Sequence, residues 1–273
     1  MLITDAQIHI WGPDTPERPW PRDGIQPQRP EPLGAPEVVA EMDRAGVARA
    51  VLVPPSWEGY RNDLALSAVA AYPGRFAVMG RIDVTQPGSV DLSTWRDQPG
   101  MLGIRVNFSL PQLRALLPDG SVEWLFSAAE RFGIPLMVLA RGQADALVGV
   151  ARRHPELRLI VDHLNLPGSI QETEIGPEID KVLPLSRLPN VAVKVSCLPS
   201  LVRESYPFPS LHPHIRRVID AFGPERCMWG SDLSRLSCPY VDWVRIAEAL
   251  AFLSEPDKEL LMGGSLANWL DWR

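Results

Sequence analysis

Cysteine is scarce in this sequence, since its 273 residues include only Cys197, Cys227 and Cys238. An odd number of cysteines without metal-type spacing argues against a disulfide framework and against a zinc site built on thiolates. The N-terminal segment MLITDAQIHIW also lacks the basic region and the long apolar region of a signal peptide. We therefore expect free thiols and a cytoplasmic location.

Positive charge is also in short supply. The 27 Lys and Arg residues are outnumbered by 33 Asp and Glu residues, and the formal net charge is -6. A chain with this balance has no electrostatic footprint for nucleic acid or for an anionic membrane surface. It contains no run of about 18 apolar residues, so no transmembrane helix is expected either. Neither a nucleic acid nor a membrane is an expected partner.

What the sequence does contain is a regular alternation of short β-branched runs with segments of helical period. Strands are expected at residues 2–10, 49–54, 76–82, 102–107, 134–140, 158–163, 191–196 and 226–231. Helices are expected at 36–45, 61–72, 121–132, 142–153, 174–187, 211–222, 239–254 and 257–270. Such repeats build right-handed parallel units, and eight of them predict one α/β domain over residues 1–273, a (β/α)₈ TIM barrel. A doubly wound open sheet is disfavoured because the first turn, HIWGPDTP, lacks a Gly-rich phosphate fingerprint.

The connection after the first strand is unusual. Residues 12–36 carry eight prolines and Trp20. So many prolines are incompatible with a helix or a central strand, so a long irregular loop is expected. In a barrel this loop leaves from the face that holds the active site. It is either a wall over that site or surface decoration, and the sequence leaves both open.

Polar side chains recur at the carboxyl ends of the expected strands, which converge on one cavity in a barrel. Gln7 and His9 lie on the first strand, His163 ends the sixth, and Asp232 follows the eighth. Two imidazoles and a carboxylate are a competent set for a divalent metal with an open coordination position. They equally suit a metal-free acid/base group, because imidazole titrates near neutrality and a carboxylate can orient it.

A second group at the strand ends is basic. Arg81, Arg105, Arg141 and Lys194 all lie at or near strand ends. Guanidinium groups match carboxylates in bidentate geometry, so a small anionic substrate is the expected partner. The alternative for each arginine is a structural ion pair that only holds a loop.

Six stretches together resemble the amidohydrolase superfamily, in its amidohydrolase-related branch. They are, in chain order, DAQIHIW, GMLGIRVN, ELRLIVDHLNLPG, NVAVKVSCLPS, FGPERCMWGSDLS and GGSLANWL. The resemblance implies a distorted TIM barrel that hydrolyses lactones, amides or related esters. It also implies that His9 is the second His of the HxH motif, that Asp232 is the base acting on water, and that Arg105 contacts a substrate carboxylate. Gln7 stands in place of the first His, which removes a strong metal ligand.

The function we expect is therefore opening of a lactone that bears a carboxylate, without a cofactor, since some lactonases of this branch work without metal. Asp232 would activate water, while His9, His163 and Gln7 would polarise the carbonyl. The remaining substrate-binding candidates are Arg105, Arg141, Lys194, Trp11 and Ser196.

Two other functions are kept open. The first is a decarboxylase of aromatic or unsaturated acids, which would hold one Zn or Mn ion on His9, His163 and Asp232. The second is a non-catalytic small-molecule binder. Trp269 and Trp272 are candidates for a homo-oligomer interface.

Overall fold

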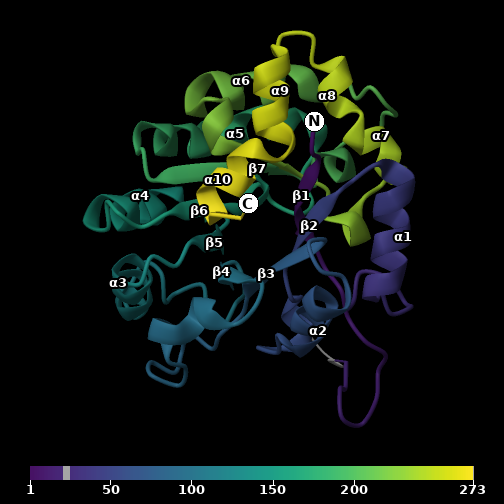
Figure 1. The fold of residues 1–273 in the computed structure, drawn as a ribbon. Helices are drawn as coiled ribbons and strands as arrows, with labels where there is room; N and C mark the ends of the chain where they lie inside the picture. Colours follow the sequence, from purple (N-terminus) through teal and green to yellow (C-terminus); the bar gives the residue numbers. More distant parts are fainter. Residues whose placement is uncertain (21–24, 273) are drawn as a thin grey trace.

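The protein is described by a computed structural model that covers residues 1–20 and 25–272. Eight parallel strands form one sheet in sequence order, and helices surround it (Figure 1). The strands are β1 (Thr4–Ile8), β2 (Arg49–Leu52), β3 (Phe76–Gly80), β4 (Met101–Asn107), β5 (Leu136–Leu139), β6 (Leu159–Val161), β7 (Val191–Ser196) and β8 (Cys227–Gly230). The predicted TIM barrel is confirmed, with every strand at its expected place.

The helices alternate with these strands as predicted, with local differences. They are α1 (Ala35–Ala45), α2 (Asp63–Ala71), α3 (Glu123–Arg131), α4 (Ala144–Arg153), α5 (Ile175–Val182), α6 (Leu211–Phe222), α7 (Tyr240–Val244), α8 (Ile246–Ala249), α9 (Glu255–Glu259) and α10 (Ser265–Leu270). The helix expected at 174–187 ends early, and a 3₁₀ turn that contains Pro184 continues it. The helix expected at 239–254 is divided into α7 and α8. None of these described helices is long and apolar enough to cross a bilayer.

The last predicted helix, 257–270, is interrupted by a wide turn at Leu260–Gly264. Gly263 lies there with φ 158°, and a Cβ at this position would come within 2.9 Å of the Leu2 carbonyl oxygen. The close approach of the N-terminal segment therefore requires glycine and displaces the helix. Beyond the turn, Leu266 and Leu270 of α10 join the cluster of side chains inside the barrel.

That inner cluster fills the barrel with alternate side chains of the strands. Its strand members are Ala6, Val51, Ala77, Met79, Leu102, Met137, Ile160, Ala192 and Met228. Trp269 and Trp272, proposed above as exposed aromatics, are instead half-buried against this cluster. The barrel is thus a packed core at one end, and the other end remains for a site.

The seam between β1 and β8 is closed by a side chain. The fully buried Asp5 carboxylate accepts hydrogen bonds from the Gln7 backbone N–H (2.8 Å), the Ser231 backbone N–H (2.9 Å) and the Tyr240 hydroxyl (2.7 Å). Burial raises the pKa of Asp5 to about 6, although these hydrogen bonds oppose the shift. One backbone bond, from the Asp232 N–H to the Gln7 carbonyl oxygen (3.0 Å), crosses the seam directly. This is the distortion that the family resemblance implied.

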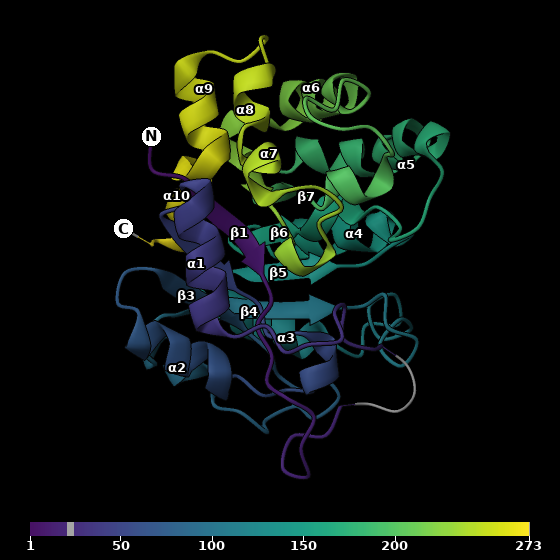
Figure 2. The same cartoon turned by 90° about the vertical axis from the view of Figure 1, so that its right-hand side faces the viewer.

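The loop at 12–36 is irregular as predicted, and its residues 21–24 lie outside the described part. Trp11 donates its backbone N–H to Leu33 (3.0 Å), and the Trp20 indole donates to the Gly12 carbonyl oxygen (2.9 Å). On the far side, Arg29 donates to the Leu233 carbonyl oxygen (2.9 Å). In Figure 2 the returning segment passes the arrow tip of β4. The loop is therefore fastened on both sides of the barrel mouth.

Candidate active site

A cavity of about 250 Å³ lies at the carboxyl ends of the strands. Its lining brings together the predicted residues His9, Arg105, Arg141, His163 and Asp232. The other lining residues are Ile25, Gln26, Gln28, Ser56, Trp57, Asn107, Leu139 and Arg235. Because three of them belong to residues 25–28, the proline-rich loop is a wall of the site and not surface decoration.

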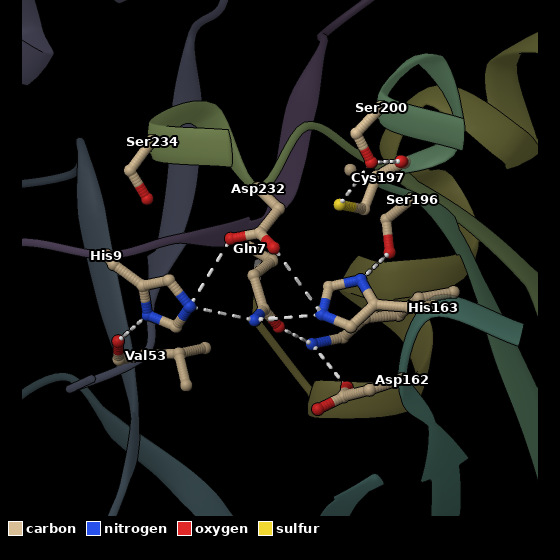
Figure 3. A network of polar contacts seen from close by, with 12 residues as sticks. Gln7, His9, Val53, Asp162, His163, Ser196, Cys197, Ser200, Asp232 and Ser234 are labelled. Carbon is tan, nitrogen blue, oxygen red and sulfur yellow. Dashed lines mark hydrogen bonds and ion pairs between the residues drawn. The ribbon is translucent and has the colours of Figure 1, made fainter. Parts of the chain in front are cut away.

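Gln7 lies beneath this cavity, between the two imidazoles (Figure 3). Its amide nitrogen is 3.3 Å from Nε2 of His9 and 3.3 Å from Nε2 of His163. Its amide oxygen accepts a hydrogen bond from the Lys194 ammonium (2.7 Å). Gln7 is fully buried and is not among the residues that line the cavity, so the structure places it one layer below the expected substrate contacts.

Each imidazole uses its other ring nitrogen to anchor itself to the barrel. Nδ1 of His9 faces the Val53 carbonyl oxygen at 2.5 Å, and Nδ1 of His163 faces the Ser196 hydroxyl at 2.8 Å. A carbonyl oxygen can only accept, so His9 carries its proton on Nδ1. Burial lowers the pKa of His9, and it lowers the pKa of His163 to about 4. Both rings are therefore neutral at neutral pH.

Asp232 places its carboxylate beside both rings. One oxygen is 3.3 Å from Nε2 of His9, and the other is 3.8 Å from Nε2 of His163. Burial would raise the pKa of Asp232, but the attraction of its carboxylate to the cationic forms of His9 and His163 and to the Arg235 guanidinium outweighs burial and lowers the pKa. Its Oδ1 has no hydrogen-bond partner within the described chain. The carboxylate is thus ionised and available to a molecule in the cavity.

Lys194, which was expected to bind substrate, is not among the residues that line the cavity. It is fully buried, and its ammonium is 2.9 Å from Oδ1 of Asp162, whose Oδ2 accepts from Nε of Arg105 (3.0 Å). Burial opposes ionisation of Asp162, but Lys194 and Arg105 outweigh it and hold its pKa well below the usual range. Burial lowers the pKa of Lys194, whereas the Asp162 carboxylate favours its charged form. Lys194 is thus part of a buried ionic network.

Trp11 and Ser196, both expected to bind substrate, do not line this cavity, although Ser196 lines a small neighbouring pocket that shares His163 and Asp232 with it. Trp11 lines a separate apolar cavity of about 420 Å³ beside α1 and α2. Its ring packs edge-on against Trp57, which does line the site, with 5.3 Å between ring centroids. Ser196 is 1% exposed and contacts His163. Both support residues of the cavity wall.

Several lining residues were not singled out from the sequence as substrate contacts, among them the amides Gln26, Gln28 and Asn107. The two glutamines lie in the proline-rich loop, where no periodic pattern shows which side chains face inward. Gln28 is held there by a hydrogen bond from the Ser234 hydroxyl. Asn107 is the last residue of β4, so its position at a strand end was the available signal.

A divalent cation does not fit this arrangement well. His163, Cys197 and Asp232 present ligand atoms within 4.8 Å of one another, and Nε2 of His9 is near. However, the Nε2 lone pairs that would bind a metal face the amide N–H groups of Gln7. Burial also raises the pKa of the Cys197 thiol to about 12, which disfavours a thiolate ligand.

Comparison with known proteins agrees with this barrel. A family model described as amidohydrolase matches residues 4–265. The chain belongs to the amidohydrolase family. This amidohydrolase is 28% identical to an L-fucono-1,5-lactonase of Burkholderia ambifaria, over 97% of this chain and 94% of the relative. It is 26% identical to a 4-sulfomuconolactone hydrolase of Hydrogenophaga intermedia, over 84% of this chain and 73% of the relative.

Solved structures share the fold. An amidohydrolase from Burkholderia multivorans has a TM-score of 0.81 and 21% identity, over 99% of each chain. A 5-carboxyvanillate decarboxylase from Sphingomonas paucimobilis has a TM-score of 0.72 and 19% identity, also over 99% of each chain. Both reactions weighed from the sequence, lactone hydrolysis and decarboxylation, thus occur among proteins similar to this amidohydrolase.

Proposed function

We propose that this amidohydrolase opens a small lactone that carries an anionic group, and that it does so without a metal. The observation that carries the proposal is the ionised Asp232 carboxylate, which has an unpartnered oxygen and lies in a cavity lined by Arg105, Arg141 and Arg235. The two curated relatives, both lactone hydrolases by name, support the same reaction.

Arg141 and Arg235 would hold the anionic group of the substrate. Arg141 and Arg235 have no carboxylate partner among the residues of the two described ranges, although Arg141 donates its Nε to the Leu166 carbonyl oxygen (2.8 Å). Burial, Arg235 and Arg105 lower the pKa of Arg141, which reflects crowding of like charges. An anion between Arg141 and Arg235 would relieve that repulsion.

Arg105 would face the reacting carbonyl. The buried Asp162 holds its guanidinium, so the donor is fixed before the substrate binds. The imidazoles cannot serve as the donors that the sequence suggested, because each directs Nε2 toward Gln7 and Nδ1 toward its own anchor. We assign the stabilisation of the oxyanion to Arg105 instead.

In the proposed reaction Asp232 removes a proton from water as the water oxygen attacks the lactone carbonyl. The negative charge that develops on the carbonyl oxygen is stabilised by Arg105. The ring C–O bond then breaks, and the proton passes from Asp232 to the departing ring oxygen, which leaves a hydroxy acid. A carboxylate with a lowered pKa is a weak base, which favours a reactive lactone over an amide as substrate.

The named substrates of the two relatives provide the test. A pH-indicator assay would follow acid release from 4-sulfomuconolactone, which is anionic, and from L-fucono-1,5-lactone, which is neutral. We expect hydrolysis of both, with the larger kcat/KM for the anionic lactone. Preference for the neutral lactone would contradict the assignment of the arginines, and saturable binding without turnover would instead indicate a non-catalytic binder.

The decarboxylase alternative depends on a metal bound by His9, His163 and Asp232. The Gln7 amide weighs against it, because it competes for both imidazole lone pairs. Release of carbon dioxide from 5-carboxyvanillate in the presence of Mn²⁺ would favour this alternative over the lactonase.

A cytoplasmic location and a homo-oligomeric state are also proposed. The three cysteines are free, which supports a cytoplasmic location. A homo-oligomer stays a proposal without support from Trp269 and Trp272, which pack against the barrel. Light scattering of the purified chain would measure its mass in solution.

A further inference from the structure

Lys194 determines which way the Gln7 amide faces. The side chains of both residues are fully buried, and the ammonium lies 2.7 Å from the amide oxygen. An ammonium can only donate hydrogen bonds, so the oxygen of the amide must face it and the NH₂ group must face away. If the amide turned over, its two N–H donors would meet the N–H donors of Lys194.

The NH₂ group then meets two acceptors. Nε2 of His9 and Nε2 of His163 are both 3.3 Å from the amide nitrogen, and the amide carries two hydrogens. The Nδ1 proton of His9 goes to the Val53 carbonyl oxygen, and the inference gives His163 the matching tautomer, in which Nδ1 donates to the Ser196 hydroxyl. Every donor of this set therefore has one acceptor.

We propose that Gln7 and Lys194 act as one unit that takes the place of a divalent cation between His9 and His163. Gln7 supplies the positive ends of two N–H bonds to the imidazoles, and Lys194 is a positioning residue that keeps them there. Asp162, which contacts both Lys194 (2.9 Å) and Arg105 (3.0 Å), fixes the ammonium in turn. The inference rests on the proposed metal-free reaction.

The unit also excludes a cation. A metal would need the same Nε2 lone pairs that the amide hydrogens occupy. It would also lie close to the Lys194 ammonium, so the charges would repel one another. Replacing Gln7 alone would remove the N–H donors that face the imidazoles. Replacing Lys194 alone would let the Gln7 amide turn and offer its oxygen to a metal.

The first test changes the amide and measures metal affinity. Gln7→Glu keeps the shape but replaces the N–H donors with a second acceptor oxygen between the imidazoles. Titration with Zn²⁺, followed by calorimetry, should show an affinity at least about 100-fold above that of the unmodified protein. The matched control, Gln26→Glu, adds the same charge to the cavity wall at a side chain that has no hydrogen bond to either imidazole, and its gain should stay below about 3-fold.

Equal affinities in the unmodified protein and folded Gln7→Glu would overturn the proposal, as would an equal gain in Gln26→Glu. Turnover is not the readout. A failure here would therefore leave the lactonase assignment standing, and a failure of that assignment would leave the metal affinities interpretable.

The second test uses the unmodified protein. The chain has five histidines, so a ¹⁵N-histidine spectrum is simple to assign. In the unmodified protein, His9 and His163 should both be neutral with the proton on Nδ1. A proton on Nε2 of either ring would contradict the proposal, because that ring could not accept a hydrogen bond from Gln7.

The third test removes the ammonium. In Lys194→Met the Gln7 amide is free to turn over, and the affinity for Zn²⁺ should rise about 10-fold.

Discussion

Replacement of Asp232 by Asn tests the centre of the proposed reaction. The substitution keeps the size of the side chain, and Asn tolerates the left-handed backbone (φ 54°) that Asp232 adopts. The backbone bond from residue 232 to the Gln7 carbonyl oxygen is unaffected. The fold should therefore be retained.

The expected loss is catalytic. A positioned general base contributes about 10²–10⁴-fold to the rate, so kcat should fall by about 10³, which corresponds to about 4 kcal/mol. KM for the anionic lactone should change by less than about 3-fold, because Arg141 and Arg235 still bind the anion. The assay is initial-rate hydrolysis with a pH indicator, with a urea melt to compare stability.

The matched control is Asp83→Asn, which removes a carboxylate that is bonded to Thr85 and Gln86 and does not line the site. Its kcat should stay within about 2-fold of the unmodified enzyme. If Asp232→Asn retained most of the activity, or if it lost activity only by raising KM, the assignment of Asp232 as the base would be wrong.

Four further predictions follow from the site. Arg141→Gln should raise KM for an anionic lactone about 10-fold and leave a neutral lactone nearly unchanged; equal effects on both would contradict anion binding. Lys194→Ala should lower the free energy of unfolding by about 3–5 kcal/mol in a urea melt, because it leaves Asp162 buried with one partner fewer, and a cost below about 1 kcal/mol would argue against the buried ion pair. The pKa of His163 is lowered to about 4, the pKa of Asp232 is lowered from its ordinary value, and the base must be ionised. Thus kcat/KM should stay level from about pH 8 to about pH 5 and fall only below that, whereas an acid limb near pH 6.5 would indicate a titrating imidazole. Exhaustive dialysis against a chelator should leave kcat unchanged, and loss of activity that Zn²⁺ or Mn²⁺ restores would contradict the metal-free reaction.

The barrel could be predicted because its strands are buried on both faces. Such strands are nearly continuous apolar runs, as in LIV of β6 and LMVL of β5, so their positions follow from composition alone. The C-terminal helices could not be predicted in the same detail. The interruption at Gly263 depends on contact with Leu2 and Thr4 at the other end of the chain, which no local pattern indicates.

The residues of the site were also predictable, but not the depth at which each lies. Side chains of a strand alternate, so Gln7 and His9 point to the same side, as do Lys194 and Ser196. Gln7 and Lys194 each come two residues before those partners and therefore lie one layer deeper in the barrel. Counting residues back from the strand end could have indicated this depth, but the sequence analysis treated both residues as substrate contacts. Only the structure shows that they meet, 2.7 Å apart across the seam.

This contact changes the meaning of the glutamine in DAQIHIW. An amide at position 7 does not by itself remove a metal, because an amide can turn and offer its oxygen as a ligand. The ammonium of Lys194 removes that freedom, and Asp162 keeps the ammonium charged and in place. The proposed metal-free character therefore depends on a pair of residues on β1 and β7 that act together. Changing either residue should therefore raise the affinity of the site for a metal. If only the missing histidine mattered, a change at Lys194 would have no such effect.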